Sequence, residues 1–142
     1  MNVKELISVV ITSFREDIAT CQKLSNLLVE QRVYLSAGDQ NNLLKVNELI
    51  DHASDKLSKS QAERKSALEA FGLTDSREGL MTLVNKLPKT WSGEVLDLYE
   101  RLEVHIQRCS SLIDRNGELL VDQTAVIQKL LGREPTSYQR TD

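Results

Sequence analysis

The chain has 142 residues, of which 40% are hydrophobic and 27% charged, and its formal net charge is −3. This balance excludes a disordered chain and a nucleic-acid-binding surface, because the first lacks apolar residues and the second needs clustered Lys and Arg to neutralise phosphates. Aromatic residues make up 4%, and there are 6 glycines and 2 prolines. Strands are rich in aromatic residues and need frequent turns, so this composition favours helices.

The first predicted helix covers about residues 2–35, where apolar residues recur at steps of three and four and form one stripe. The stripe consists of Val3, Ile7, Val10, Phe14, Ile18, Cys21, Leu24, Leu28 and, after a gap, Leu35. Arg15, Glu16 and Asp17 interrupt the early apolar run, so we expect no secretory signal. No part of the chain approaches the roughly 18 apolar residues of a membrane span. The expected compartment is the cytoplasm.

A short break at residues 36–39 separates the first helix from the second. Gly38 suits the left-handed position that follows a helix, and Asp39 can cap the next N-terminus. A connection this short predicts that the second helix, at about residues 40–71, returns antiparallel to the first.

The second helix has a seam with a spacing near 3.5 residues, and Gly72 ends it. The seam consists of Leu43, Val46, Ile50, Ala53, Leu57, Ala67 and Phe71. The pattern weakens at Ser60 and Arg64. We therefore expect this end of the helix to splay from the bundle or to contact a partner.

A connector at residues 73–88 contains a short helix. Residues 74–76 (Thr-Asp-Ser) offer an N-terminal cap, and Pro88 ends the segment. The apolar face of this short helix consists of Leu80, Leu83, Val84 and Leu87.

The last predicted helix runs from Ser92 to about Leu131 and has a heptad seam. The seam consists of Val95, Leu98, Leu102, His105, Cys109, Leu112, Asn116, Leu119, Gln123, Val126 and Leu130. Polar residues in a seam fix its register but reduce stability, and Gly117 costs roughly 1 kcal/mol relative to Ala. Residues 116–131 are therefore expected to be helical but weakly held.

Together these elements predict an all-α fold, namely an elongated antiparallel helical bundle of two or three long helices with a short connecting helix. Residues 1–131 are expected to form a single helical bundle domain, within which residues 116–131 are mobile. Residues 132–142 have no periodicity and are expected to be a disordered tail.

Residues that could carry catalysis are few and scattered. Cys21 and Cys109 lie on apolar stripes and are expected to be small buried hydrophobes, although a disulfide between them remains open. Neither His52 nor His105 has a glutamate three residues earlier, as a di-iron bundle requires. The chain also has no phosphate-binding glycine motif. We therefore expect no enzymatic activity, no metal or cofactor, and no small-molecule ligand.

Three parts of the chain resemble a known family. They are the hairpin Leu24-x-x-Leu27-Leu28-x-Glu30-x4-Leu35-x-x-Gly38-Asp39-x3-Leu43-Leu44 with its continuation Arg64-x3-Leu68-x-x-Phe71-Gly72, the block Asn116-x-x-Leu119-Leu120-x-x-Gln123, and the tail Glu134-Pro135-Thr136-Ser137-Tyr138. In these parts the chain is similar to the FlgN-type flagellar export chaperones, and the resemblance extends over nearly its whole length.

The resemblance implies a bacterial cytoplasmic chaperone that binds hook-filament junction proteins, also called flagellar hook-associated proteins. Such a chaperone prevents premature assembly and delivers its client to the export gate, a membrane protein. The resemblance implies that the C-terminal region binds cargo, here through Asn116, Leu119, Leu120, Gln123, Val126, Ile127 and Leu130. It also implies that Tyr138 docks to the gate, although Gln139 stands where the family often has glycine.

Two alternatives stay open on the residues alone. Residues 116–131 can pack on the first hairpin instead of a client, or they can mediate a weak homodimer. The whole chain can also be a structural subunit or helical adaptor, in which the same seam forms a permanent homo-oligomeric coiled coil. A chaperone is expected to be monomeric or weakly dimeric alone and to form a defined complex with its client.

Overall fold

The computed structural model describes residues 1–131, apart from the side chains of residue 124 and residues 126–129. Within this part there are four helices and no strand, which confirms the predicted all-α class. The helices are α1 (Val3–Ala37), α2 (Gln40–Glu69), α3 (Arg77–Val84) and α4 (Lys89–Leu130). The predicted tail, residues 132–142, lies outside the described residues.

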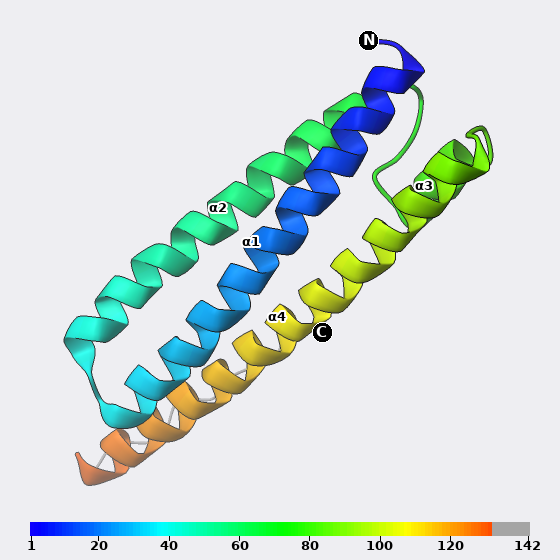
Figure 1. Cartoon of the computed structure of the whole chain (residues 1–142). Helices are drawn as coiled ribbons and strands as arrows, with labels where there is room; N and C mark the ends of the chain where they lie inside the picture. Colours follow the sequence, from blue (N-terminus) through cyan, green and yellow to red (C-terminus); the bar gives the residue numbers. More distant parts are fainter. Residues whose placement is uncertain (132–142) are drawn as a thin grey trace.

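The three long helices lie lengthwise beside one another, with α1 between α2 and α4 (Figure 1). Both outer helices pack on α1, whereas α2 and α4 make little contact with each other. α2 runs back along α1, and α4 runs in the same direction as α1 (Figure 1). The antiparallel arrangement predicted from the sequence thus describes the α1–α2 hairpin, while the α1–α4 pair is parallel.

The turn between α1 and α2 forms as its local chemistry predicts. Gly38 has a φ of 67°, in the left-handed region, and its N–H donates to the carbonyl oxygen of Leu35 at 3.3 Å. The carboxylate of Asp39 accepts a hydrogen bond from the backbone N–H of Asn42 at 3.2 Å and so caps α2. A glycine after one helix and an acidic cap before the next satisfy backbone groups that both helix ends leave unpaired.

The segment from α2 to α4 also follows local signals, with one difference in a boundary. The hydroxyl of Ser76 accepts from the N–H of Gly79 at 3.1 Å and caps α3, as predicted. α4 begins at Lys89, three residues before the predicted Ser92. Pro88 directly precedes it, and its carbonyl accepts the first helical bonds from Trp91 and Ser92. The fixed φ of proline suits this position, so the helix starts directly after it.

One hydrophobic core joins all four helices, and α1 contributes most of it. The predicted stripe of α1 is buried except at its ends, where Val3 is exposed and Leu35 is half-buried. α1 also buries residues outside that stripe, namely Leu6, Ser13, Asp17, Thr20, Ser25 and Leu27. A single stripe is enough to pack against one neighbouring helix. The additional residues are buried because α1 packs against two helices, α2 and α4.

The end of α2 does not splay, because Arg64 ties it to α1. Arg64 is 6% exposed, and its Nη1 donates to Asp17 Oδ2 and to Ser13 Oγ, both at 2.6 Å. Its Nε donates to Asp75 Oδ1 at 3.1 Å, which joins the loop before α3 to the same guanidinium. The guanidinium also lies 4.8 Å from the centre of the Phe14 ring, within the range of a cation–π contact. The expectation that this end splays from the bundle is therefore wrong, whereas contact with a partner stays a prediction.

Candidate functional site

A fixed register between α1 and α4 sets the position of every candidate residue. The Sγ of Cys109 lies 3.4 Å from the carbonyl oxygen of Cys21, and the side chains of Asn116 and Gln123 make equivalent contacts. All three contacts join residues that are 88 positions apart in sequence. A constant offset at steps of seven residues is the pattern of a parallel, heptad-paired helix interface. The seam predicted for α4 therefore faces α1.

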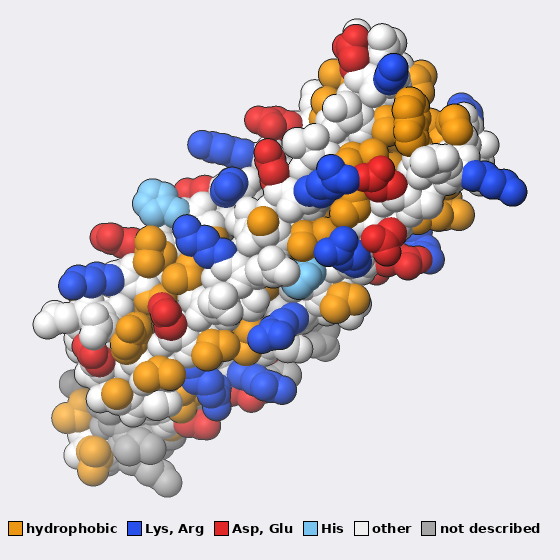
Figure 2. Space-filling view, in the orientation of Figure 1, with side chains coloured by type: hydrophobic (Ala, Val, Ile, Leu, Met, Phe, Trp, Pro, Cys, Tyr) orange, Lys and Arg blue, Asp and Glu red, His pale blue; other side chains and the backbone are white. Residues whose placement is uncertain are grey.

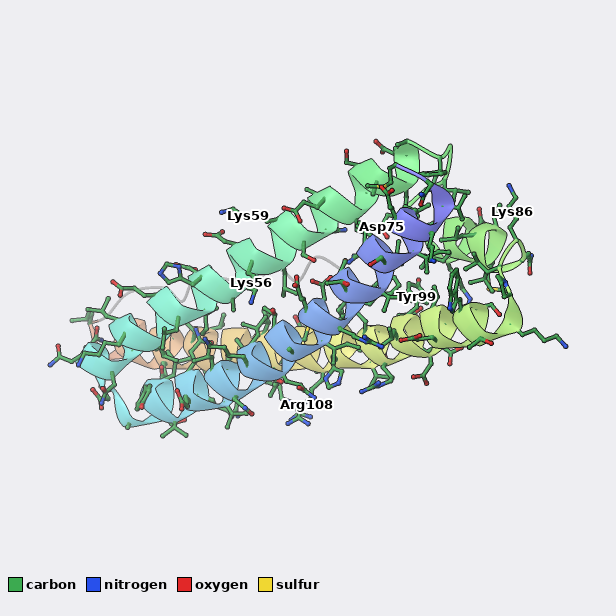
Figure 3. All side chains as sticks on the ribbon, turned by 45° about the horizontal axis from the view of Figure 1, so that its top comes forward. Lys56, Lys59, Asp75, Lys86, Tyr99 and Arg108 are labelled. Carbon is green, nitrogen blue, oxygen red and sulfur yellow. The ribbon has the colours of Figure 1, made fainter. Side chains whose placement is uncertain are left out.

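The character of this interface changes along its length. Towards α3, α4 buries apolar residues: Val95, Leu98, Leu102 and Cys109. In this part Tyr99 stands between α1 and α4 (Figure 3), with its ring centre 5.9 Å from that of Phe14. Beyond Cys109 the contacts of α4 with α1 include two amide side chains, one buried and one half-buried.

Asn116 is the first of these amides and is 4% exposed. Its Nδ2 donates to the carbonyl oxygen of Leu28 and to Oε1 of Gln31, both at 2.8 Å. Gln31 in turn donates to Oδ1 of Asn47 at 2.8 Å, so a chain of amides joins α4, α1 and α2. The Oδ1 of Asn116 is buried without a hydrogen-bond partner among the described residues. An unpaired buried polar atom costs stability, so this attachment is weaker than an apolar one.

Gln123 is the second amide and lies one heptad further. Its Nε2 donates to the carbonyl oxygen of Leu35 at 2.6 Å. This carbonyl belongs to the last turn of α1 and also accepts the N–H of Gly38. Arg32 adds a 3.2 Å bond to the carbonyl oxygen of Arg115. The end of α4 is therefore held at the end of α1 largely through polar contacts.

Beside Gln123 the structure has an open cleft of about 580 Å³, here called the distal cleft. The hairpin turn and the first residues of α2 form one wall, and α4 forms the other. The lining residues are Tyr34, Leu35, Ser36, Ala37, Gly38, Gln40, Leu43, Leu120, Asp122 and Gln123. Figure 2 shows hydrophobic side chains at this lower-left end of the molecule, next to the residues that are not described.

The predicted cargo residues fall into four groups. Asn116 faces α1 and is buried, and Leu119 is half-buried. Leu120 and Gln123 line the distal cleft, and Leu120 is 53% exposed. Leu130 is 81% exposed near the end of α4. The side chains of Val126 and Ile127, and Tyr138 as a whole, lie outside the described residues.

The opposite wall of this cleft was not predicted from the sequence. Tyr34 and Leu43 come from the two sides of the hairpin turn, more than 75 residues before Leu120 in the chain. Leu43 was assigned to the internal seam of α2, where it is only half-buried. Only the parallel register of α1 and α4 brings the turn and the Asn–Leu–Leu–Gln block to the same end.

The ionisable groups with shifted pKa values lie outside the distal cleft. Burial raises the pKa of the Cys21 thiol to about 11, and the neighbouring Cys109 adds to this effect. Burial also raises the pKa of Cys109 and that of Tyr99. Among the described residues there is no group of three or more side chains suited to hold a metal ion. None of the helices within residues 1–131 is both long and apolar enough to cross a membrane.

The fold and this site define an elongated helical bundle in which a parallel helix pair ends beside an open cleft. The chain belongs to the FlgN protein family, whose sequence pattern matches residues 1–132. This confirms the resemblance seen in the sequence. The crystal structure of a Pseudomonas aeruginosa protein assigned as flagella synthesis protein FlgN shares the fold, with a TM-score of 0.70 and 23% sequence identity. The match covers 77% of this chain and 84% of that one. No protein of curated function matches the sequence.

Proposed function

We propose that this protein is a cytoplasmic chaperone of flagellar export that binds hook-filament junction proteins, prevents their premature assembly and delivers them to the export gate. Membership of the FlgN family and the likeness to a flagella synthesis protein support this proposal. The observation that carries it is the end of α4, where aliphatic side chains are exposed beside the distal cleft.

The client that fits this site is an amphipathic helix. Helices of this kind bind in apolar grooves through residues spaced by three and four positions. Leu120 and Leu130 are 53% and 81% exposed, and Leu43 lines the facing wall of the cleft. Full burial of an exposed aliphatic side chain contributes roughly 1.5–3 kcal/mol, and a side chain that is already half covered contributes about half of that. The predicted cargo residues Asn116 and Gln123 play a different part, because they attach α4 to α1 and so position the exposed leucines.

Titration with peptides that carry the terminal helices of hook-filament junction proteins tests the proposal. Replacing Leu120 and Leu130 together by serine is expected to weaken binding at least tenfold, which is about 1.4 kcal/mol. Val104→Ser is the matched control, because Val104 is also on α4, is 65% exposed, and does not line the cleft. Unchanged affinity of the double variant, or an equal loss in the control, would contradict a client site at this end.

A structural homo-oligomer is the second candidate function, and one observation favours it. Ile106, Ile113 and Leu120 recur every seven residues along α4 and are each about half exposed. Such a stripe can pair with a second helix in a coiled coil. Sedimentation analysis of the purified chain separates the two functions. A chaperone is a monomer or weak dimer that forms a defined complex with its client, whereas a structural subunit is a stable oligomer without it.

A further inference from the structure

The two cysteines of the chain, far apart in sequence, meet in the α1–α4 interface. Cys21 is 1% exposed and Cys109 is 5% exposed. The 3.4 Å contact places the sulfur of Cys109 against the backbone of the residue that carries the other thiol. Both cysteines are free thiols. Neither has a part in the client site proposed above.

The register of the helix pair favours a disulfide between the two cysteines. Such a bond needs two Cα atoms within about 7 Å and side chains that point towards each other. Cys21 and Cys109 occupy matched positions of a parallel heptad interface, because the same 88-residue offset joins Asn116 to Leu28 and Gln123 to Leu35. Matched core positions of parallel helices face each other at one level.

We propose that Cys21 and Cys109 form an intramolecular disulfide that fastens α4 to α1 when the protein meets a disulfide oxidant. The bond lies seven residues before Asn116, which is about 10 Å along the helix. The disulfide therefore holds α4 to α1 directly before residues 116–131, the segment that Asn116 and Gln123 attach weakly. The inference does not depend on the client, because it concerns only the two helices.

The chemistry is thiol–disulfide exchange, with oxidised glutathione as the probe. The thiolate of one cysteine attacks a sulfur of the reagent, whose S–S bond breaks and releases one glutathione thiolate. The second cysteine then attacks the protein sulfur of this mixed disulfide and releases the second glutathione. The cysteines lose two electrons and two protons, and one oxidised glutathione becomes two molecules of the reduced form.

The docked interface makes this reaction slow. Thiolates are the attacking species, and burial raises the pKa of both thiols, so both stay protonated near neutral pH. Oxidised glutathione also cannot reach side chains that are almost fully covered. The first step therefore requires α4 to separate briefly from α1. The rate of oxidation therefore measures how often α4 separates from α1. Once the disulfide has formed, the two helices can no longer separate at this point.

The experiment incubates the reduced full-length protein with oxidised glutathione, in buffer and in sub-denaturing urea, and follows its intact mass. The wild type is expected to lose the mass of two hydrogen atoms, to remain monomeric and to keep its helical circular dichroism, and urea is expected to accelerate the reaction. The midpoint of thermal unfolding should rise by roughly 10 °C and return on reduction. Cys21→Ala and Cys109→Ala are expected to yield only glutathione adducts.

Three results would overturn the proposal. The first is a wild type that forms only glutathione adducts or intermolecular dimers in both buffers, since the sulfurs then do not meet. The second is an internal disulfide that forms with loss of helical signal, because the bond then requires another structure. The third is an internal disulfide with no change in thermal midpoint, which means that it does not fasten α4.

Discussion

Arg64 and Asp17 form a buried ion pair across the α1–α2 interface, with Nη1 and Oδ2 2.6 Å apart. Asp75, labelled in Figure 3, contacts the same guanidinium at 3.1 Å, so one cation pairs with two carboxylates from different parts of the chain. α2 buries only three other residues, Val46, Ala53 and Leu68. α2 is therefore attached to α1 by this pair together with a modest apolar face, whose half-buried members include Ile50 and Leu57.

Replacing Arg64 by alanine is expected to lower the free energy of unfolding by about 3–5 kcal/mol. The reason is that Asp17 remains buried without its counter-charge, which costs more than the pair itself contributes. Urea unfolding followed by circular dichroism measures the loss. Lys65→Ala is the control, because its pair with Glu69 at 4.0 Å is exposed and contributes less than about 1 kcal/mol. Equal losses in both variants would show that Arg64 is not the attachment.

The Arg64 network shows what the sequence could not predict. An arginine in a helical seam is usually a sign of an exposed face, and only the tertiary structure brings Ser13, Asp17 and Asp75 around it. The hairpin turn could be predicted because Gly38 and Asp39 satisfy backbone groups within a few residues. Local signals were therefore enough to predict the helices and their caps. The polar contacts between helices could be predicted only with the relative alignment of the helices, which the sequence does not show.

The candidate site was predictable to the same extent. The Asn–Leu–Leu–Gln block predicted a cargo site in this part of the chain, but not which of its side chains face outwards. Asn116 and Gln123 lie towards α1, and Leu120 lies in the distal cleft, because α4 runs parallel to α1. Periodicity gives the faces of a helix but not the direction of the neighbour that covers one of them.

Replacing Asn116 by leucine is expected to raise the free energy of unfolding by about 1 kcal/mol. The substitution removes the buried Oδ1 that lacks a partner and adds apolar contact in a heptad seam, where polar residues reduce stability. Urea unfolding measures the change. Leu112→Asn, one turn earlier in the same seam, is the converse control and is expected to destabilise. A clear loss of stability in Asn116→Leu would mean that the bonds to Leu28 and Gln31 outweigh the unpaired oxygen.

Stability is expected to fall between about pH 9 and pH 11 through the ionisation of Cys21. Burial, with a further contribution from Cys109, raises the pKa of this thiol from 9.0 to about 11. The folded protein therefore keeps a proton that the unfolded chain releases, so the stabilisation is complete below pH 9 and is lost as the pH rises to 11. A shift of this size corresponds to about 2–3 kcal/mol.

Urea unfolding of the wild type and of Cys21→Ala at several pH values isolates this effect. Tyr99 and Cys109 also have raised pKa values and ionise in a similar range, but both remain in the variant. The difference in unfolding free energy between the two proteins is expected to shrink above pH 9. A difference that is constant from pH 8 to pH 11 would show that the pKa of Cys21 is the same in the folded and the unfolded protein.

Substitution of Tyr138 separates client binding from gate docking. Tyr138 lies outside the described residues, after Pro135 in a segment without helical periodicity. Under the proposed function, Tyr138→Ala keeps the helix content and the client affinity but weakens association with the export gate. A single aromatic anchor at an interface contributes about 2 kcal/mol or more, which corresponds to roughly a 30-fold loss of affinity. Both affinities are measured on the same variant.

Two matched variants control this experiment. Tyr138→Phe keeps the ring and is expected to retain most of the gate affinity, which distinguishes loss of the aromatic group from damage to the tail. Gln139→Gly restores the residue that the family often has after this tyrosine and is expected to strengthen gate binding, because glycine lets the chain adopt conformations that glutamine resists. Gate binding that is equal in the wild type and Tyr138→Ala removes this residue from the mechanism. A loss of client binding in Tyr138→Ala means instead that the tail belongs to the client site, so the chain does not keep its two partners on separate surfaces.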